Sequence, residues 1–231
     1  MTHFVCGIII PKEQVDFAED YINETLEKYS ENYEVEPYVS KTKKELEKEF
    51  KEWKKKIKDK LKNSVKLEDY ELEWVEGGKL KKIPLRKWVK DWEGKERFDK
   101  KGNLLSTWNK NSFFDYYSIG GRWSGLFYGK DGKESEDLKE NIILIKDLIE
   151  KYKKAEGNIK EKILRKLSDE SKENHYLIHT IVVEGNVHRA RSYGWFGTYD
   201  EKKKENEWKE EYLKLLENHK NDFMVNLDCH I

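Results

Sequence analysis

Arginine is rare in this chain, and one short motif places it among glycines and aromatic rings. The sequence has 40 lysines but only six arginines. Arg122 lies in residues 116–123, whose sequence is YYSIGGRW. A guanidinium can bind carboxylate or phosphate with two parallel hydrogen bonds, and it stacks on aromatic rings. The motif predicts an anion-binding site; the alternative is a tight turn with Arg122 stacked on a tryptophan. The candidate ligand-binding residues are Gly120, Gly121, Arg122, Trp123 and Tyr117.

A second glycine and aromatic motif, GWFG, occupies residues 194–197 and follows another arginine, Arg191. Glycines let a backbone approach a ligand closely, and aromatic rings can stack nucleobases. We therefore add Arg191, Trp195 and Phe196 to the candidate ligand-binding residues, with a turn buried by its own rings as the alternative. Neither motif has the spacing of a P-loop or of a dinucleotide-binding loop, so we exclude both.

Asp228 and His230 lie two residues apart in the last apolar run, 223–231. Side chains alternate across a strand, so these two share a face, and Leu227 and Cys229 share the opposite face. If helices cover the apolar face, the other face can hold His3 beside them. An aspartate that orients a histidine is the minimum for general acid–base catalysis, so His230 and Asp228 are the candidate catalytic residues. A hydrogen bond that pins the strand is the alternative. The spacing is not a metal motif, and we predict no metal and no cofactor.

The elements that would position these residues follow from hydrophobic periodicity. They predict an α+β fold with a mainly antiparallel sheet and helices packed on one face. We expect a single domain, 1–231, with residues 35–115 as an elaboration whose tryptophans are packing anchors. The predicted strands are 4–10, 176–184, 187–191 and 223–231, with a turn at 185–186. The predicted helices are 11–29, 41–63, 142–167 (continuous or broken at 157–158) and 201–218. Within the elaboration, extended pieces at 70–75 and 80–85 are joined by a turn at 77–78.

Composition limits the classes of function. Basic and acidic residues number 46 each, so no net charge attracts nucleic acid to the whole molecule. Charged residues make up 40% of the chain, but eight Trp, 13 Tyr and nine Phe argue against disorder. No run is long enough to span a membrane, and no signal peptide is recognisable. We expect a cytoplasmic protein with no membrane partner, whose cysteines, Cys6 and Cys229, are buried and reduced.

Taken together, YYSIGGRW, GWFG and the final Asp-Cys-His-Ile resemble the motifs of a family of uncharacterised phage and actinobacterial proteins. The resemblance covers the first strand, 113–128 and 176–231, but not the lysine-rich segment 40–110. It implies a phage or prophage accessory protein, a group that includes inhibitors of bacterial immunity such as anti-CRISPR proteins. Three functions stay open: binding of a nucleotide or nucleic acid through the arginine and aromatic site, metal-independent phosphodiesterase or nuclease activity, and protein-binding inhibition of a host defence protein.

Overall fold

The computed structural model describes residues 2–93, 97–128, 135–164, 176–194 and 198–231. The chain divides into two compact units. The core unit comprises Met1–Tyr33 and Asn109–Ile231, and the inserted unit comprises Glu34–Trp108. The inserted unit coincides closely with the segment 35–115 that the sequence marks as an elaboration.

In the described residues of the core unit, six strands form one sheet with the order β6-β12-β1-β8-β9, and β7 also pairs with β12. β1 runs antiparallel to β12 over its whole length, and parallel to β8. This arrangement confirms the α+β class and the mainly antiparallel sheet, and it places the first and last strands side by side. The strands are β1 (His3–Ile10), β6 (Tyr116–Ile119), β7 (Ile142–Leu144), β8 (Thr180–Val183), β9 (Asn186–Arg189) and β12 (Phe223–His230).

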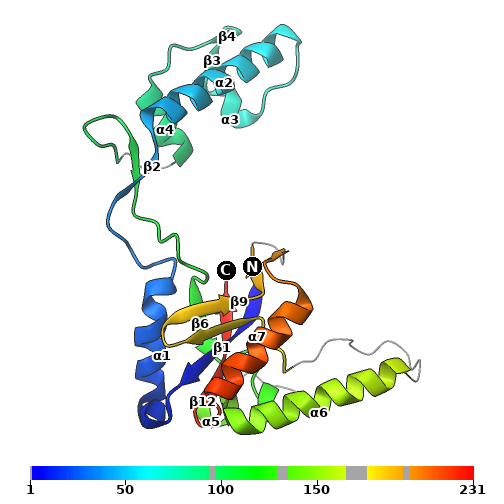
Figure 1. Ribbon diagram of the computed structural model, residues 1–231. Helices are drawn as coiled ribbons and strands as arrows, with labels where there is room; N and C mark the ends of the chain where they lie inside the picture. Colours follow the sequence, from blue (N-terminus) through cyan, green and yellow to red (C-terminus); the bar gives the residue numbers. More distant parts are fainter. Residues whose placement is uncertain (1, 94–96, 129–134, 165–175, 195–197) are drawn as a thin grey trace. The chain divides into compact units, whose positions relative to one another are not determined.

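Helices cover both faces of this sheet, and the expectation of helices on one face is wrong. α1 lies on one side, and α6 and α7 lie on the other (Figure 1). The reason is the composition of β1, whose continuous apolar run leaves both of its faces in need of cover. The helical elements of the core unit are η1 (Lys12–Phe17), α1 (Ala18–Leu26), η2 (Glu27–Tyr29), η3 (Leu126–Tyr128), α5 (Leu138–Asn141), α6 (Ile145–Leu164) and α7 (Glu205–Asn218); a separate hairpin joins β10 (Arg191–Tyr193) to β11 (Tyr199–Glu201).

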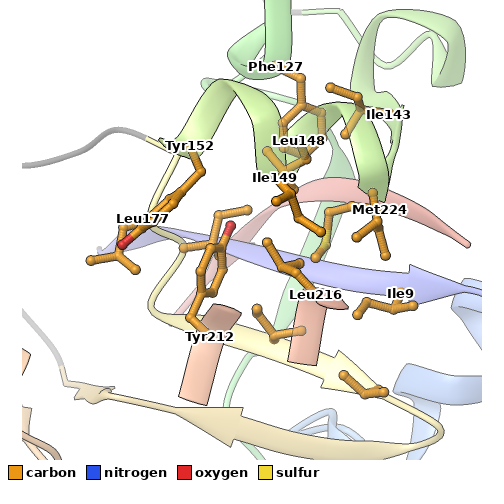
Figure 2. Packing of buried hydrophobic residues seen from close by; sticks show 14 of the residues in the cluster. Ile9, Phe127, Ile143, Leu148, Ile149, Tyr152, Leu177, Tyr212, Leu216 and Met224 are labelled. Carbon is orange, nitrogen blue, oxygen red and sulfur yellow. The ribbon is translucent and has the colours of Figure 1, made fainter. Parts of the chain in front are cut away.

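The two hydrophobic clusters follow the alternation of side chains along β1 and β12. On one face, Ile9 and Met224 pack against Leu148 of α6 and Leu216 of α7 (Figure 2). On the other face, a second cluster packs against α1 and contains both cysteines. Cys6 and Cys229 are buried and free, as predicted.

Two local predictions need correction. α6 runs without a break through 157–158, since one glycine costs a helix only about 1 kcal/mol. The turn between β8 and β9 consists of Glu184 and Gly185, with φ of +48° and +70°, one residue earlier than predicted. Positive φ at both central residues is typical of a two-residue hairpin turn that matches the twist of its strands.

The inserted unit is built around one long helix, α2. Thr42 and Glu45 form a capping box that begins it: the Thr42 hydroxyl accepts from the Glu45 backbone N–H, and the Glu45 carboxylate accepts from that of Thr42. The predicted turn at 77–78 is present, but a helix occupies 69–72, where the extended piece 70–75 is predicted, and the helix at 85–93 is not predicted from the sequence. The elements are β2 (Tyr38–Lys41), α2 (Lys43–Lys62), α3 (Asp69–Leu72), β3 (Val75–Glu76), β4 (Lys79–Leu80), α4 (Leu85–Glu93) and β5 (Leu104–Ser106).

Candidate phosphate site at the end of the sheet

Strand register brings two histidines together at one end of the sheet. His3 of β1 pairs with His230 of β12, and their ring centroids lie 4.9 Å apart in an edge-to-face arrangement. The predicted polar face therefore exists, and it holds His3, Asp228 and His230. Each histidine, however, has its own carboxylate partner.

Asp228 holds His3 and the glycine-rich turn at the same time. Its Oδ1 lies 2.9 Å from Nδ1 of His3, and its Oδ2 accepts a hydrogen bond of 3.1 Å from the backbone N–H of Arg122. The Asp228 side chain is 7% exposed, whereas that of His3 is 16% exposed. One nearly buried carboxylate thus fixes a partly accessible imidazole and the backbone of the rare arginine.

His230 pairs with a residue that the sequence did not single out. Its Nδ1 lies 2.7 Å from Oδ1 of Asp115, and its ring stacks on Tyr116 at 4.4 Å. The side chain is only 4% exposed, and its Nε2 is buried without a hydrogen-bond partner among the described residues. The sequence predicts that Asp228 orients His230, and this is wrong. The two residues share a face, but Asp228 bonds to His3 and His230 bonds to Asp115.

The turn of residues 120–123 is packed tightly against buried polar side chains. Gly120 and Gly121 have φ of +69° and +51°, and a Cβ on Gly121 would lie 2.6 Å from Oδ2 of Asp228. The Asn226 side chain donates to the backbone oxygen of Trp123 at 2.9 Å. Packing alone therefore explains both glycines, as the tight-turn alternative required. Arg122 itself is exposed, and no described residue forms an ion pair with it.

Other candidate residues lie elsewhere. Tyr117 belongs to the opposite face of the sheet, where its hydroxyl donates to Asn23 of α1. Arg191 lies in β10, with its guanidinium 4.8 Å from the ring centroid of Tyr199. Trp195 and Phe196 lie outside the described residues.

The GWFG segment nevertheless begins beside the site. The hydroxyl of Thr2 donates to the backbone oxygen of Gly194 at 3.0 Å, and Tyr193 stacks on Phe4 at 4.4 Å. Thr2 and Phe4 flank His3 in the chain, but Phe4 and Tyr193 belong to the cluster on the opposite face of the sheet. The motif therefore begins at the same end of β1 as the paired histidines, on the other face of the sheet. The structure thus brings two motifs into direct contact and starts the third one nearby.

A groove of about 750 Å³ separates α1 from β6, and its lining is acidic. Tyr116 and Tyr117 contribute rings to it, but no described lysine or arginine lines it. Burial raises the pKa of Tyr117 to about 12. Such a groove repels phosphate, so an anionic ligand would bind on the Arg122 side of β6. The carboxylates that line the groove are Glu19, Glu24, Glu27, Asp115 and Glu136.

Asp115 and Tyr116 are the site residues that sequence reasoning missed. They are the two residues before Tyr117 in the chain. Side chains alternate along β6, so the ring of Tyr116 lies on the histidine face and that of Tyr117 lies on the opposite face. The signal was present in the alternation of β6. It could be used only once the register of β6 against β12 was known.

Comparisons of the chain with protein-family models, curated proteins and solved structures gave no match. Within the described residues, no helix is long and apolar enough to cross a membrane. The same residues contain no group of three or more His, Cys, Asp or Glu side chains that could hold a metal ion.

Proposed function

We propose that the core unit binds the phosphate-bearing end of a nucleotide or nucleic acid, with Arg122 as its cationic contact and the imidazole of His3 as a second contact. The observation that carries this proposal is the double role of Asp228, which fixes the imidazole of His3 and the backbone of Arg122 with its two oxygens. Fixing the imidazole of His3 and the backbone of Arg122 in advance lowers the conformational entropy that binding would cost.

The chemistry of the site suits a phosphate next to a base. The exposed guanidinium of Arg122 supplies a permanent charge and two parallel donors. Tyr116 is 52% exposed although one side of its ring stacks on His230, so it offers surface for a base. Tyr117 lies on the opposite face of the sheet from His3 and His230, so it is not among the proposed contacts.

The biological setting belongs to the same proposal. The resemblance of the three motifs supports a phage or prophage accessory protein acting in the cytoplasm of a bacterial host. Sequestering a nucleotide signal, or covering a nucleic-acid end, would then interfere with a host immune system. This setting rests on the motifs, whereas the phosphate site rests on the geometry around Asp228.

The test is a comparison of arginine variants. Arg122→Lys keeps the charge but loses the paired donors, so we expect at least about ten-fold weaker binding of a 5′-phosphorylated oligonucleotide. The melting temperature should stay nearly unchanged, because only the backbone of Arg122 takes part in the turn. Arg97→Lys, at an exposed position in the inserted unit, is the matched control and should bind like the wild type.

Two results count against the proposal. Equal binding of phosphorylated and unphosphorylated oligonucleotides would mean that no phosphate site exists. A collapse of thermal stability in Arg122→Lys would make Arg122 a structural brace.

A second candidate function is metal-independent phosphodiester cleavage. The observation in its favour is the partly exposed His3, whose Nδ1 is held by Asp228 in the manner of a general base. In this arrangement the reactive imidazole is His3, because Nε2 of His230 is buried. Turnover of cyclic nucleotides or short RNA in the presence of a chelator, lost in His3→Ala, would establish the enzyme. Absence of turnover at every pH between about 5 and 8 would favour the pure binder.

A further inference from the structure

A pocket with aromatic walls lies in the inserted unit, far in sequence from the motifs discussed above. Its volume is about 310 Å³, at the lower end of the range for small-ligand sites. Three indoles and a phenol line it, together with two carboxylates: Trp53, Trp74, Trp88, Tyr70, Glu73 and Asp91.

The walls of the pocket are set at steep angles and supported from behind. The rings of Trp53 and Trp74 lie 5.7 Å apart with planes at 82°, and Trp53 and Trp88 lie 6.0 Å apart at 44°. Phe50 stacks on Trp53 at 5.9 Å and contacts Trp88 at 5.3 Å. Trp88 is 6% exposed and belongs to the hydrophobic core of this unit. The rings therefore form a preformed concave surface.

An ion pair between α2 and α3 fixes the position of Trp74. Nζ of Lys60, on α2, lies 2.7 and 2.8 Å from the two carboxylate oxygens of Glu71, on α3. Glu71 also accepts a hydrogen bond from the backbone N–H of Glu68, which begins α3. Hydrogen bonding to Lys60 lowers the pKa of Glu71, so the pair stays charged at neutral pH. Because Trp74 follows α3 directly, the pair holds it near the helix that carries Trp53.

The charge of the pocket selects its ligand. The face of an indole attracts cations within about 6 Å of its centroid. The carboxylates of Glu73 and Asp91 are exposed, and neither has a hydrogen bond or ion pair to a described residue. The nearest ammonium on the rings is Nζ of Lys87, 5.8 Å from the centroid of Trp74, close to the limit of attraction. The ammonium of Lys81 donates to the backbone oxygen of Glu73, not to its carboxylate. The pocket thus combines cation-attracting walls with two carboxylates that form no ion pair with a described residue.

We propose that this pocket binds a substituted ammonium group, either a methylated lysine side chain of a protein or a free quaternary ammonium compound. A primary ammonium is strongly hydrated and needs hydrogen-bond acceptors, whereas aromatic rings suit a cation whose methyl groups have replaced its N–H donors. Calcium and magnesium ions need six or more oxygen ligands, and two carboxylates do not supply them.

The test uses the full chain and follows indole N–H resonances during titration with tetramethylammonium and with choline. The neutral isostere of choline, in which a tert-butyl group replaces the trimethylammonium group, is the ligand control. We expect resonances of the pocket tryptophans to shift with both cations and far less with the isostere. Equal affinity for choline and its isostere would show a merely apolar pocket and overturn the proposal. So would a Kd for both cations weaker than about 10 mM.

Substitutions in the pocket test whether the shifted indole N–H resonances report binding there. Combining Glu73→Gln with Asp91→Asn should weaken cation binding about three- to ten-fold without unfolding the unit, because both side chains are exposed. Trp74→Leu should weaken it at least about ten-fold. Trp108→Phe, at a tryptophan that is 52% exposed and does not line the pocket, should bind like the wild type. Unchanged binding in both pocket variants would contradict the assignment.

A third comparison distinguishes a methylated lysine of a protein from a free quaternary ammonium compound as the ligand. A peptide with a trimethylated lysine is titrated beside the unmodified peptide and beside free choline. Binding of the methylated peptide at least about ten-fold tighter than choline would identify a protein ligand, since the flanking residues would then add contacts. Equal affinities would identify a small molecule, and preference for the unmodified peptide would overturn the proposal. Arg122→Lys should change none of these values, so this test is independent of the phosphate site.

Discussion

The two candidate sites of this molecule differ in what their polar groups are bonded to. At the end of the sheet, His3, Asp228, His230 and Asp115 pair with one another across strands, and little of their hydrogen-bonding capacity faces outward. In the inserted unit, the pocket carboxylates lack partners among the described residues, and rings form the walls. The first site is therefore also part of the fold, whereas the carboxylates of the second can be altered with little effect on stability. Substitutions at the two sites should separate these properties.

The largest effect is expected at Asp228. Asp228→Ala removes the acceptor of two hydrogen bonds from a nearly buried position and leaves His3 and the Arg122 backbone without their partner. We expect a loss of about 3–4 kcal/mol in the free energy of unfolding, measured by urea denaturation. Asp200→Ala, at a highly exposed aspartate of the same unit, should change it by less than about 0.5 kcal/mol. A loss below about 1 kcal/mol at Asp228 would show that the site is not part of the fold.

A pair of glycines tests the same contrast at matched backbone geometry. Gly121 in the core unit and Gly77 in the inserted unit have φ of +51° and +53°, so alanine meets similar backbone strain at both. A Cβ at Gly121 would lie 2.6 Å from Asp228, but at Gly77 it would meet nothing within 4 Å. We expect losses of about 2–4 kcal/mol for Gly121→Ala and about 1 kcal/mol for Gly77→Ala. Equal losses would mean that the turn can shift away from Asp228.

A smaller effect is expected from the ion pair behind the aromatic pocket. Glu71→Gln weakens the bond to Lys60 and should loosen Trp74, which lowers the affinity for tetramethylammonium about two- to five-fold. Glu76→Gln, at an exposed position in the same unit, is the control and should leave the affinity unchanged. The phosphate binding proposed for the core unit should not respond to either substitution. Unchanged cation affinity in Glu71→Gln would show that Trp74 is held by other contacts.

The smallest effect concerns pH and Tyr117. Burial raises its pKa to about 12 in the folded protein, whereas an unfolded tyrosine ionises near 10. The unfolded state therefore releases a proton first, and this contribution to stability falls as pH rises from about 10 to about 12. Tyr117→Phe lacks this contribution. The difference in the free energy of unfolding between variant and wild type should therefore be smaller above pH 10 than it is at pH 8. A constant difference across this range would contradict the burial of the hydroxyl.

Much of the sheet could be predicted from the sequence, because strands carry their own pattern. The apolar runs of β1 and β12 and the alternation around Asp228 place His3, Asp228 and His230 on one face without any structural information. The partners of these residues could not be predicted. Asp115 meets His230 only through the register of β6, and a shift of one residue exchanges Tyr116 for Tyr117 on that face.

The aromatic pocket shows a different limit. Tryptophans in the elaboration were interpreted as packing anchors, and Trp88 is one, since it is buried in the core of the inserted unit. Trp53 lies in α2, whereas Trp74 lies in the turn that follows α3. Sequence gives no measure of the angle between two rings or of the distance from a ring to Glu73. Whether a tryptophan fills a core or lines a cavity is therefore decided by the tertiary structure.

The pairing of β1 with β12 also has a consequence for synthesis and folding. The hydrogen bond between His3 and Asp228 joins residues 225 positions apart, so the centre of the sheet cannot close until nearly the whole chain between them has left the ribosome. The inserted unit needs only contacts within its own continuous segment. Because contacts between distant residues form slowly, we expect the inserted unit to fold first, while both apolar faces of β1 are still uncovered. During that interval β1 is the segment most exposed to aggregation and to chaperone binding.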